Sequence, residues 1–478
     1  MAVIRSVSID PYKSRKMQDN ISNIQDEHIS MPVTEEYALV DGNLFDAHTG
    51  TVFSDKAIWV QEDRIEAVCR PADLPSDVFR ISLPGHTIFP GFIDVHVHTE
   101  EWHSPLFLAK GITTVRDLGC DLESILDRRT RWSVKGAEAP RLICTGPVLD
   151  HPGNTWSAIT RIVRNPAEAR LAVDALVAHG VDQIKTYALL DLPTYQAIVD
   201  QAHYHGKRVI SHLGKQVNAR QAIEAGVDEI QHLSGVSEAL WWERNDASDR
   251  WEWMQLWSEL DQTRMETLIK LILDKRTRMA ITRLVWLRLA SGWDPRHRDH
   301  SQMEYVPAPL LKFWDQFLPD KELIREYPKD IRVPTRQDRA QMVAGMAIFT
   351  TELFKRNARF LIGTDVPFLY LVPGFSFHDE IWALLECGAD ESAVLQAATL
   401  HGAEALEIDH LVGSIEAGKL ADLVIVRGNP LADMRDLDQI EATVRDGRWY
   451  YPQELLSKAR SYVQVATASE TKRFNQIY

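Results

Sequence analysis

The chain has 478 residues, 45% of them hydrophobic and 25% charged, as in an ordinary globular protein with room for one large and one smaller domain. A net charge of −15 argues against a nucleic-acid or anionic-membrane surface, because both partners require basic patches. The four cysteines form no Cys-x-x-Cys pair, the N-terminus lacks a signal-peptide core, and no apolar run approaches the roughly 20 residues of a membrane span. We therefore expect a cytoplasmic protein with reduced cysteines.

The two ends of the chain carry patterns of short strands. Residues 1–34 lack periodicity and are predicted to be a mobile arm, whereas 35–89 contain strand patterns at 37–40, 57–60 and 64–68, separated by turn residues. Strand patterns return within 411–452. We predict that 35–89 and 411–452 form one discontinuous β-sandwich domain. Residues 453–478 are predicted to be a tail that contributes to a homo-oligomer contact.

Residues 92–97 are an apolar, β-branched run that predicts a buried strand after Pro90 and Gly91. Side chains alternate along a strand, so His96 and His98 should point the same way. Two neighbouring imidazoles provide half of a coordination shell for a divalent metal. A lone His-x-His is more often accidental, so its meaning depends on the rest of the chain.

Residues 90–410 alternate between strand and helix patterns. Helices begin near Asn165-Pro166 and Pro193 and end at Gly180 and Gly206, and a strand pattern follows each. The full set of predicted strands is 92–97, 113–117, 141–145, 181–187, 208–213, 227–233, 279–283 and 359–364. Eight such units predict an α/β fold, a (β/α)8 TIM barrel. Trp-rich helical inserts at about 236–340 are expected to wall an apolar pocket over the strand ends.

Four further predicted strands end in a residue that can ligate a metal: Lys185, His212, His232 and Asp365. Each alone is more often structural. Because the carboxyl ends of all barrel strands meet at one mouth, we expect these residues to converge there with His96 and His98.

Three motifs together resemble the amidohydrolase superfamily, in particular its imidazolonepropionase- and prolidase-like branch. They are Pro-Gly-Phe-Ile-Asp-Val-His-Val-His at 90–98, Ala-Ala-Thr at 397–399, and Gly-Ser-Ile-Glu-Ala-Gly-Lys-Leu-Ala-Asp-Leu-Val at 413–424. The resemblance covers residues 37 to about 450. It is specific for the superfamily and far less so for a substrate.

The resemblance implies a centre with two divalent metal ions. His96, His98 and Asp365 would bind one ion, and His212 and His232 the other. Lys185 would be carboxylated by CO2, so that its carbamate bridges both ions. A mixed shell of this kind suits Zn best, and also Co, Mn or Fe. Asp365 would be the catalytic residue, which takes a proton from a metal-bridging hydroxide and delivers it to the leaving nitrogen.

Four residues lie just past predicted strands three, four, seven and eight, where side chains reach substrate. We predict that they bind substrate: His151, Tyr187, Arg283 and His378.

These expectations lead to a metal-dependent amidohydrolase that cleaves a C–N bond in an amide, urea or carbamate of a small apolar or aromatic substrate. The alternatives are a mononuclear aminohydrolase or deaminase with unmodified Lys185, a prolidase-like dipeptidase, and a non-catalytic scaffold. A deaminase is disfavoured because no Glu closely follows His212 or His232. A scaffold is disfavoured because all six ligand positions are filled. The number of bound metal ions distinguishes the binuclear from the mononuclear enzyme.

Overall fold

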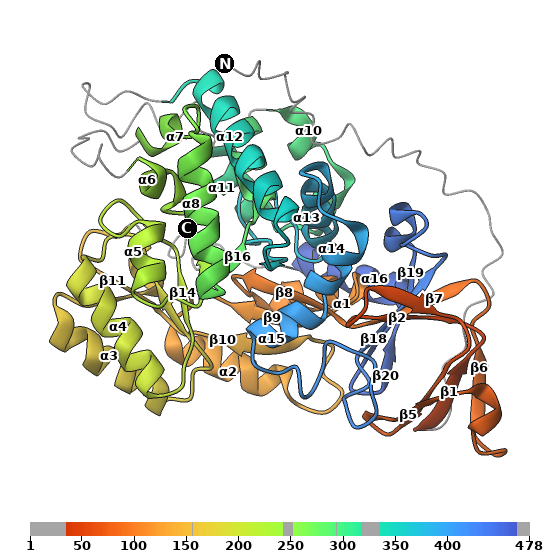
Figure 1. The fold of residues 1–478 in the computed structure, drawn as a ribbon. Coiled ribbons are helices and arrows are strands. Elements are labelled where there is room, and N and C mark those ends of the chain that lie inside the picture. Colours follow the sequence, from red (N-terminus) through yellow and green to blue (C-terminus); the bar gives the residue numbers. More distant parts are fainter. Residues whose placement is uncertain (1–34, 155, 242–251, 293, 317–333, 466–478) are drawn as a thin grey trace.

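The computed structural model describes residues 35–154, 156–241, 252–292, 294–316 and 334–465. A barrel of parallel strands surrounded by helices lies beside a domain of β-strands from both ends of the described chain (Figure 1). The predicted combination of a TIM barrel and a discontinuous β domain is confirmed. The predicted N-terminal arm lies outside the described residues.

Eight parallel strands form the barrel. They are β8 (Phe92–Val97), β9 (Ile112–Asp117), β10 (Arg141–Cys144), β13 (Ile184–Thr186), β14 (Val209–Ser211), β15 (Glu229–Gln231), β16 (Arg278–Ala280) and β17 (Phe360–Leu361). Regular pairing divides them between two sheets, which meet at two seams. At one seam Val95 N–H donates to Ile362 O (3.0 Å), and at the other Asp182 N–H donates to Cys144 O (2.9 Å). The barrel is therefore closed.

Most predicted strands were too long. The predicted strand 227–233, for example, is regular only over Glu229–Gln231, because His232 and Leu233 take left-handed backbone angles (φ 62° and 54°). The predicted strand 279–283 was wrong at its end as well, since helix α9 (Arg283–Ser291) begins there. Two strands were not predicted: β11 (Val148–Asp150) and β12 (Thr160–Ile162), which extend the sheet beside β13.

Helices cover the outside of the barrel, and their capping residues explain where they begin. The Asn165 side chain accepts a hydrogen bond from Glu168 N (2.9 Å), and Pro166 occupies the first turn, as predicted. The helices between and after the barrel strands are α1 (Ser104–Ala109), α2 (Leu122–Trp132), α3 (Pro166–Ala178), α4 (Leu192–Tyr204), α5 (Ala219–Glu224), α8 (Gln262–Lys275), α12 (Arg336–Lys355), α13 (Phe375–Glu386), α14 (Glu391–Ala397) and α15 (Leu400–Ala405). None of the described helices is both long and apolar enough to span a bilayer.

The predicted helical inserts are present in the described part of 236–340. They contain α6 (Val236–Leu240), α7 (Glu252–Leu256), α9, α10 (Pro295–Arg298) and α11 (Ala308–Gln316). Trp257 and Trp314 are buried inside the inserts, where each indole contributes core burial. Trp286, in contrast, reaches the barrel mouth, because its Nε1–H donates to His232 O (2.9 Å).

The β domain joins both ends of the described chain. One sheet has the order β5-β4-β1-β6 and the other β20-β19-β18-β7-β2-β3. In Figure 1 the red N-terminal and blue C-terminal strands lie side by side beside the barrel. The strands are β1 (Glu36–Val40), β2 (Asn43–Asp46), β3 (Thr51–Phe53), β4 (Ala57–Gln61), β5 (Arg64–Cys69), β6 (Phe79–Ser82), β7 (His86–Pro90), β18 (Leu423–Arg427), β19 (Ile440–Arg445) and β20 (Arg448–Tyr450). Because β7 pairs with β18 and continues into β8, this sheet anchors the strand that carries His96.

An ion pair across this sheet predicts a pH-dependent stability. His86 Nε2 lies 2.8 Å from Glu441 Oε2, and the hydrogen bond with Glu441 raises the pKa of His86 despite partial burial. A raised histidine pKa contributes stability below its unfolded value of about 6.5, and this contribution is lost as the pH rises through the folded value. We expect the melting temperature of wild type to exceed that of His86→Gln at pH 6, with the difference shrinking toward pH 8. Parallel curves would contradict this assignment.

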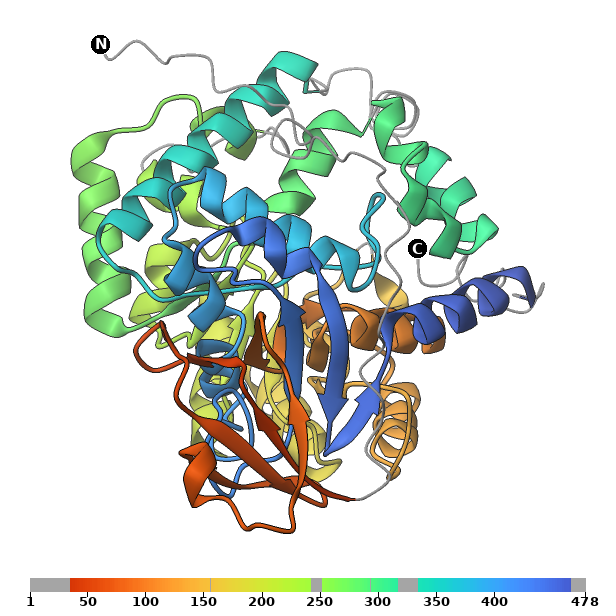
Figure 2. The same cartoon turned by 90° about the vertical axis from the view of Figure 1, so that its right-hand side faces the viewer.

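The predicted tail is in part a helix, α16 (Pro452–Val465), and the remaining residues 466–478 lie outside the described chain. Figure 2 shows this helix leaving the β domain and extending along the molecule. It packs against α1. Its Arg460 also pairs with Glu304 of the insert through two hydrogen bonds (3.0 and 2.9 Å). Within the described residues, α16 thus contacts its own chain; a homo-oligomer contact stays a prediction.

Candidate metal centre

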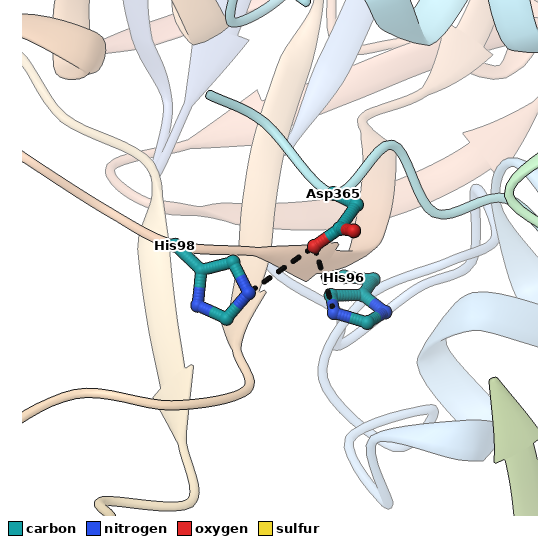
Figure 3. Close-up of side chains that lie close together, drawn as sticks. All are labelled: His96, His98 and Asp365. Carbon is teal, nitrogen blue, oxygen red and sulfur yellow. Dashed lines mark ion pairs between the residues drawn. The ribbon is translucent and has the colours of Figure 1, made fainter. Parts of the chain in front are cut away.

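His96, His98 and Asp365 meet at the carboxyl ends of β8 and β17 (Figure 3). Oδ1 of Asp365 lies 3.2 Å from Nε2 of His96 and 3.1 Å from Nε2 of His98. Ligand atoms held 2.0–2.2 Å from one ion at angles between 90° and 110° are about 2.8–3.6 Å apart, so the observed spacing suits a common divalent ion. The His98 side chain is 28% exposed and that of His96 only 2%, which shows that the site opens on the His98 side.

Backbone contacts between β8 and the segment after β17 create this meeting point. Asp365 N–H donates to His96 O (2.7 Å), and the Asp365 backbone is left-handed (φ 60°). The neighbouring Thr364 is fixed to β8, because its N–H and its hydroxyl both donate to the buried carboxylate of Asp94 (3.1 and 2.7 Å). A Cβ at Gly363 would lie only 2.8 Å from the Cβ of His96, so only glycine lets the two strands approach this closely.

Two of the predicted ligand histidines, His98 and His232, make their hydrogen bonds through Nδ1, which leaves Nε2 available for a metal ion. His98 Nδ1 lies 3.2 Å from the carbonyl of Gly119, which can only accept. His232 Nδ1 lies 2.6 Å from Thr282 Oγ1, whose own hydrogen is donated to the Ile281 carbonyl. Both Nδ1 atoms therefore carry a hydrogen, and in the neutral form of each ring Nε2 holds a lone pair. Nε2 lone pairs pointing at a carboxylate oxygen repel it unless a cation lies between them.

His232 and His212 extend the cluster across the mouth. The ring of His232 lies 4.6 Å from that of His96 and 4.9 Å from that of His212, and its Nε2 lies 4.0 Å from Asp365 Oδ2. Burial lowers the pKa of His96 to about 4 and that of His212 to about 3. These imidazoles are therefore neutral at pH 7, which is the form that binds metals.

Lys185 completes the set from β13. Its side chain is 2% exposed, and its Nζ makes no hydrogen bond to any other described residue. Burial lowers the pKa of Lys185 to about 7, with the charge of Arg116 acting in the same direction and that of Asp365 opposing it. A buried amine without a partner is costly, and a neutral amine can react with CO2. The donor set of imidazoles, carboxylate and a modifiable amine therefore fits divalent metal ions.

Residues 87–450 match the amidohydrolase family, and residues 36–88 match the NagA composite domain. The chain belongs to the amidohydrolase family. The family matches cover the barrel and the β domain, so the expected superfamily is confirmed, and with it the expected class of enzyme, a hydrolase.

Similar proteins give less detail. Among curated proteins, adenine deaminase 4 of Rhizobium meliloti (strain 1021) is 50% identical over 60 residues, which are 13% of this chain and 9% of the deaminase. The chain thus matches only about a tenth of the length of its curated relatives. Bottromycin amidohydrolase is 22% identical with a TM-score of 0.69, over 91% of this chain and 92% of that one. A putative prolidase from Bifidobacterium longum is 23% identical with a TM-score of 0.64, over 90% and 100%. At these identities the two structures show a shared fold.

Of the four predicted substrate residues, Tyr187 lies beside the predicted ligand His212. Its ring centroid is 4.5 Å from that of His212, and its hydroxyl accepts a hydrogen bond from Trp156 Nε1 (3.0 Å). Burial raises the pKa of Tyr187, so the phenol keeps its proton. His151 lies nearby but is tied to the protein on both ring nitrogens, since Nδ1 contacts Val163 O (2.8 Å) and Nε2 faces Asp191 (3.6 Å).

The structure does not bring the other two residues to the ligands. Arg283 is the first residue of α9, and its guanidinium donates to the carbonyl of Val343 in α12 (3.5 Å). His378 Nε2 contacts Lys110 O (3.0 Å) just before β9, and its ring lies 6.0 Å from that of Phe92. Phe92 begins β8, up to about 20 Å from His98 along an extended strand. His378 is thus at the amino ends of the strands, opposite the expected end.

Sequence reasoning missed residues that surround the ligands. Gln231 Oε1 lies 2.6 Å from His96 Nδ1, and Trp286 donates to the His232 carbonyl. Gln231 and Glu229 are polar residues two apart on a buried strand, so both face the inside of the barrel. That alternation is a signal visible in the sequence. No comparable pattern predicts Trp286, which comes from an insert.

Proposed function

We propose that this protein hydrolyses a C–N bond in an amide, urea or carbamate at a centre of two divalent metal ions. The observation that supports this most directly is the convergence of two imidazole Nε2 atoms on Asp365 Oδ1. His96, His98 and Asp365 would hold one ion, and His212 and His232 the other. The carbamate of Lys185 would bridge them, which would satisfy its orphaned Nζ.

When bound, the ions would supply an acidified water as nucleophile and a Lewis acid for the scissile carbonyl. Asp365 would move the proton. Its Oδ1 lies close to Nε2 of both His96 and His98. Its Oδ2 lies 4.0 Å from His232 Nε2, which is too far for a hydrogen bond. We assign Oδ2 as the atom that takes the proton and returns it to the leaving nitrogen.

Tyr187 would stabilise the oxyanion. Because its oxygen accepts from Trp156, its own hydrogen points elsewhere, and no described residue accepts it. A fixed donor of this kind is the group that hydrolysis of a carbonyl requires as negative charge develops on oxygen. Neither His151, Arg283 nor His378 offers a comparable free donor at the ligands.

Tyr187→Phe is expected to lower kcat roughly 10²–10³-fold, because a single oxyanion donor is worth about that much. Metal content and melting temperature should stay near wild type. Tyr195→Phe is the control, since Tyr195 of α4 is a buried tyrosine whose hydroxyl contacts Ser211 Oγ (2.7 Å). The control should lose about 1 kcal/mol of stability and keep kcat. Equal kinetic losses in both variants would remove Tyr187 from the site.

The walls near the ligands favour a substrate with an apolar or aromatic part. Gly119 is bordered by Val148, Ile159 and His98, because a Cβ on it would lie 3.1, 3.2 and 3.5 Å from these side chains. The half-buried Trp286 lies over His232, with ring centroids 6.3 Å apart. These surfaces would gain free energy by covering an apolar group.

A hydrolysis screen tests the proposal. Metal-replete protein is incubated with N-acyl amino acids, dipeptides, aryl ureas and carbamates, and amine release is measured before and after chelation. We expect cleavage of at least one class, loss on chelation and recovery with Zn²⁺. A metal-replete protein that cleaves none of them would contradict the proposal, and cleavage of dipeptides alone would favour a prolidase-like dipeptidase.

Hydrolytic deamination is the second candidate, and the segment shared with adenine deaminase favours it. Deamination releases ammonia from a purine amine rather than splitting an amide. Adding adenine and adenosine to the screen, with an ammonia assay, distinguishes the two reactions. Ammonia release without amide cleavage would replace the first proposal by this one.

A further inference from the structure

A chain of buried polar side chains crosses the inside of the barrel toward His96. Arg116 of β9 forms an ion pair with Glu229 of β15, and Gln231 Nε2 donates to the same carboxylate. Gln231 Oε1 then lies 2.6 Å from Nδ1 of His96. All four residues are at most 2% exposed, so each polar atom depends on its neighbour rather than on water.

The direction of every hydrogen bond in this chain follows from the charge at its far end. The Arg116 guanidinium carries only N–H groups, so it can only donate. The Glu229 carboxylate paired with it can only accept, so the NH2 group of Gln231 has to face Glu229. The carbonyl of Gln231 must then face His96. A carbonyl can only accept, so His96 Nδ1 carries the hydrogen and Nε2 keeps its lone pair.

We propose that Arg116 and Glu229, acting through Gln231, hold His96 in the tautomer whose Nε2 is free for a metal ion. Gln231 is therefore a positioning residue of the metal centre. His98 and His232 reach the same tautomer through a backbone carbonyl and a threonine, so of these three histidines only His96 depends on a charged pair. The inference rests on the metal centre proposed above, but the tautomer itself can be measured without any metal.

The test uses metal-free protein labelled with 15N-histidine. The chemical shifts of the two ring nitrogens report which one is protonated, and the His96 signals are identified by their absence in His96→Asn. Wild-type His96 should be protonated on Nδ1. Gln231→Leu removes the acceptor with little change in volume, and its His96 should lose the Nδ1-protonated form. Zn²⁺ binding by this variant, measured with a competing chelator, should weaken about 10–100-fold.

Gln183→Leu is the matched control. Gln183 is equally buried and accepts from the same guanidinium (2.8 Å), but its Nε2 donates to Ala405 O and it contacts no ligand histidine. This variant should lose stability as Gln231→Leu does, yet keep the His96 tautomer and the Zn²⁺ affinity. An equal loss of Zn²⁺ affinity in both variants would indicate a general effect of a disturbed interior and would overturn the proposal.

Glu229→Gln provides an independent arm if Gln231→Leu does not fold. A neutral amide at 229 can donate as well as accept, so Gln231 becomes free to turn round. The His96 tautomer should then become mixed, although the side chain of residue 229 is hydrogen-bonded to Arg116 and Gln231 and not to His96. If His96 is protonated on Nδ1 alone in either variant, the proposal that Arg116 and Glu229 act through Gln231 is overturned. Because the tautomer is measured without substrate, a failure of this proposal is distinguishable from a failure of the proposed hydrolysis.

Discussion

Asp365→Asn is expected to lower kcat by roughly 10²–10⁴-fold even when metal is saturating, because an amide cannot take the proton that a general base must accept. Metal affinity should fall as well, since a neutral oxygen replaces the carboxylate that faces His96 and His98. Turnover is measured across a Zn²⁺ titration, and bound metal is measured by mass spectrometry. Extrapolating to saturation separates the loss of binding from the loss of proton transfer.

Asp390→Asn is the control for this prediction. Asp390 caps α14, where its carboxylate accepts from Ser392 N (2.9 Å), and asparagine caps a helix equally well. This variant should keep both metal content and kcat. Recovery of full turnover by Asp365→Asn at saturating Zn²⁺ would leave Asp365 a metal ligand and exclude it as the base.

Lys185→Ala is expected to lose at least one metal ion per chain and nearly all turnover. A carbamate on Lys185 would carry the bridge between the ions, and no other described residue contacts its Nζ by a hydrogen bond. Short carboxylic acids should restore part of the activity, because the space left by the side chain can admit a substitute carboxylate. Wild-type protein exposed to 13C-bicarbonate should show a carbamate signal that the variant lacks.

Lys185→Met separates the chemical role from the space that the side chain fills. Methionine occupies a similar volume but cannot form a carbamate, so this variant should lose metal and turnover without being rescued by added acids. Full metal content and full turnover in Lys185→Ala would rule out the bridge. One tightly bound ion in active wild-type protein would favour the mononuclear alternative.

The six predicted ligands could be found in the sequence because each lies at or just past the carboxyl end of a predicted barrel strand. Parallel strands of a closed barrel deliver their carboxyl ends to one mouth, so the position of a residue after its strand determines where it lies. The structure places His96 and His98 beside Asp365, His232 beside His96, and His212 beside His232. Their roles as ligands remain proposals.

The same reasoning failed where the chain leaves the strand ends by an irregular path. His378 was expected at the mouth because it follows the eighth strand, but residues 366–374 lead to a helix whose start packs against α1. Arg283 was expected to extend a strand, but Thr282 is left-handed (φ 46°) and α9 begins directly after it. Turn geometry of this kind depends on contacts that sequence periodicity does not contain.

The sequence by itself determined the barrel, the β domain and the residues at the strand ends, because hydrophobic alternation and capping residues act over a few neighbouring positions. Only the tertiary structure decided which side chains meet across the barrel. Gln231 reaches His96 from a strand more than a hundred residues away. The Lys185 side chain is shielded from solvent because the whole barrel closes around it. Tautomer and pKa depend on these distant neighbours, so the chemistry of the ligands is set by the closed fold rather than by the local sequence.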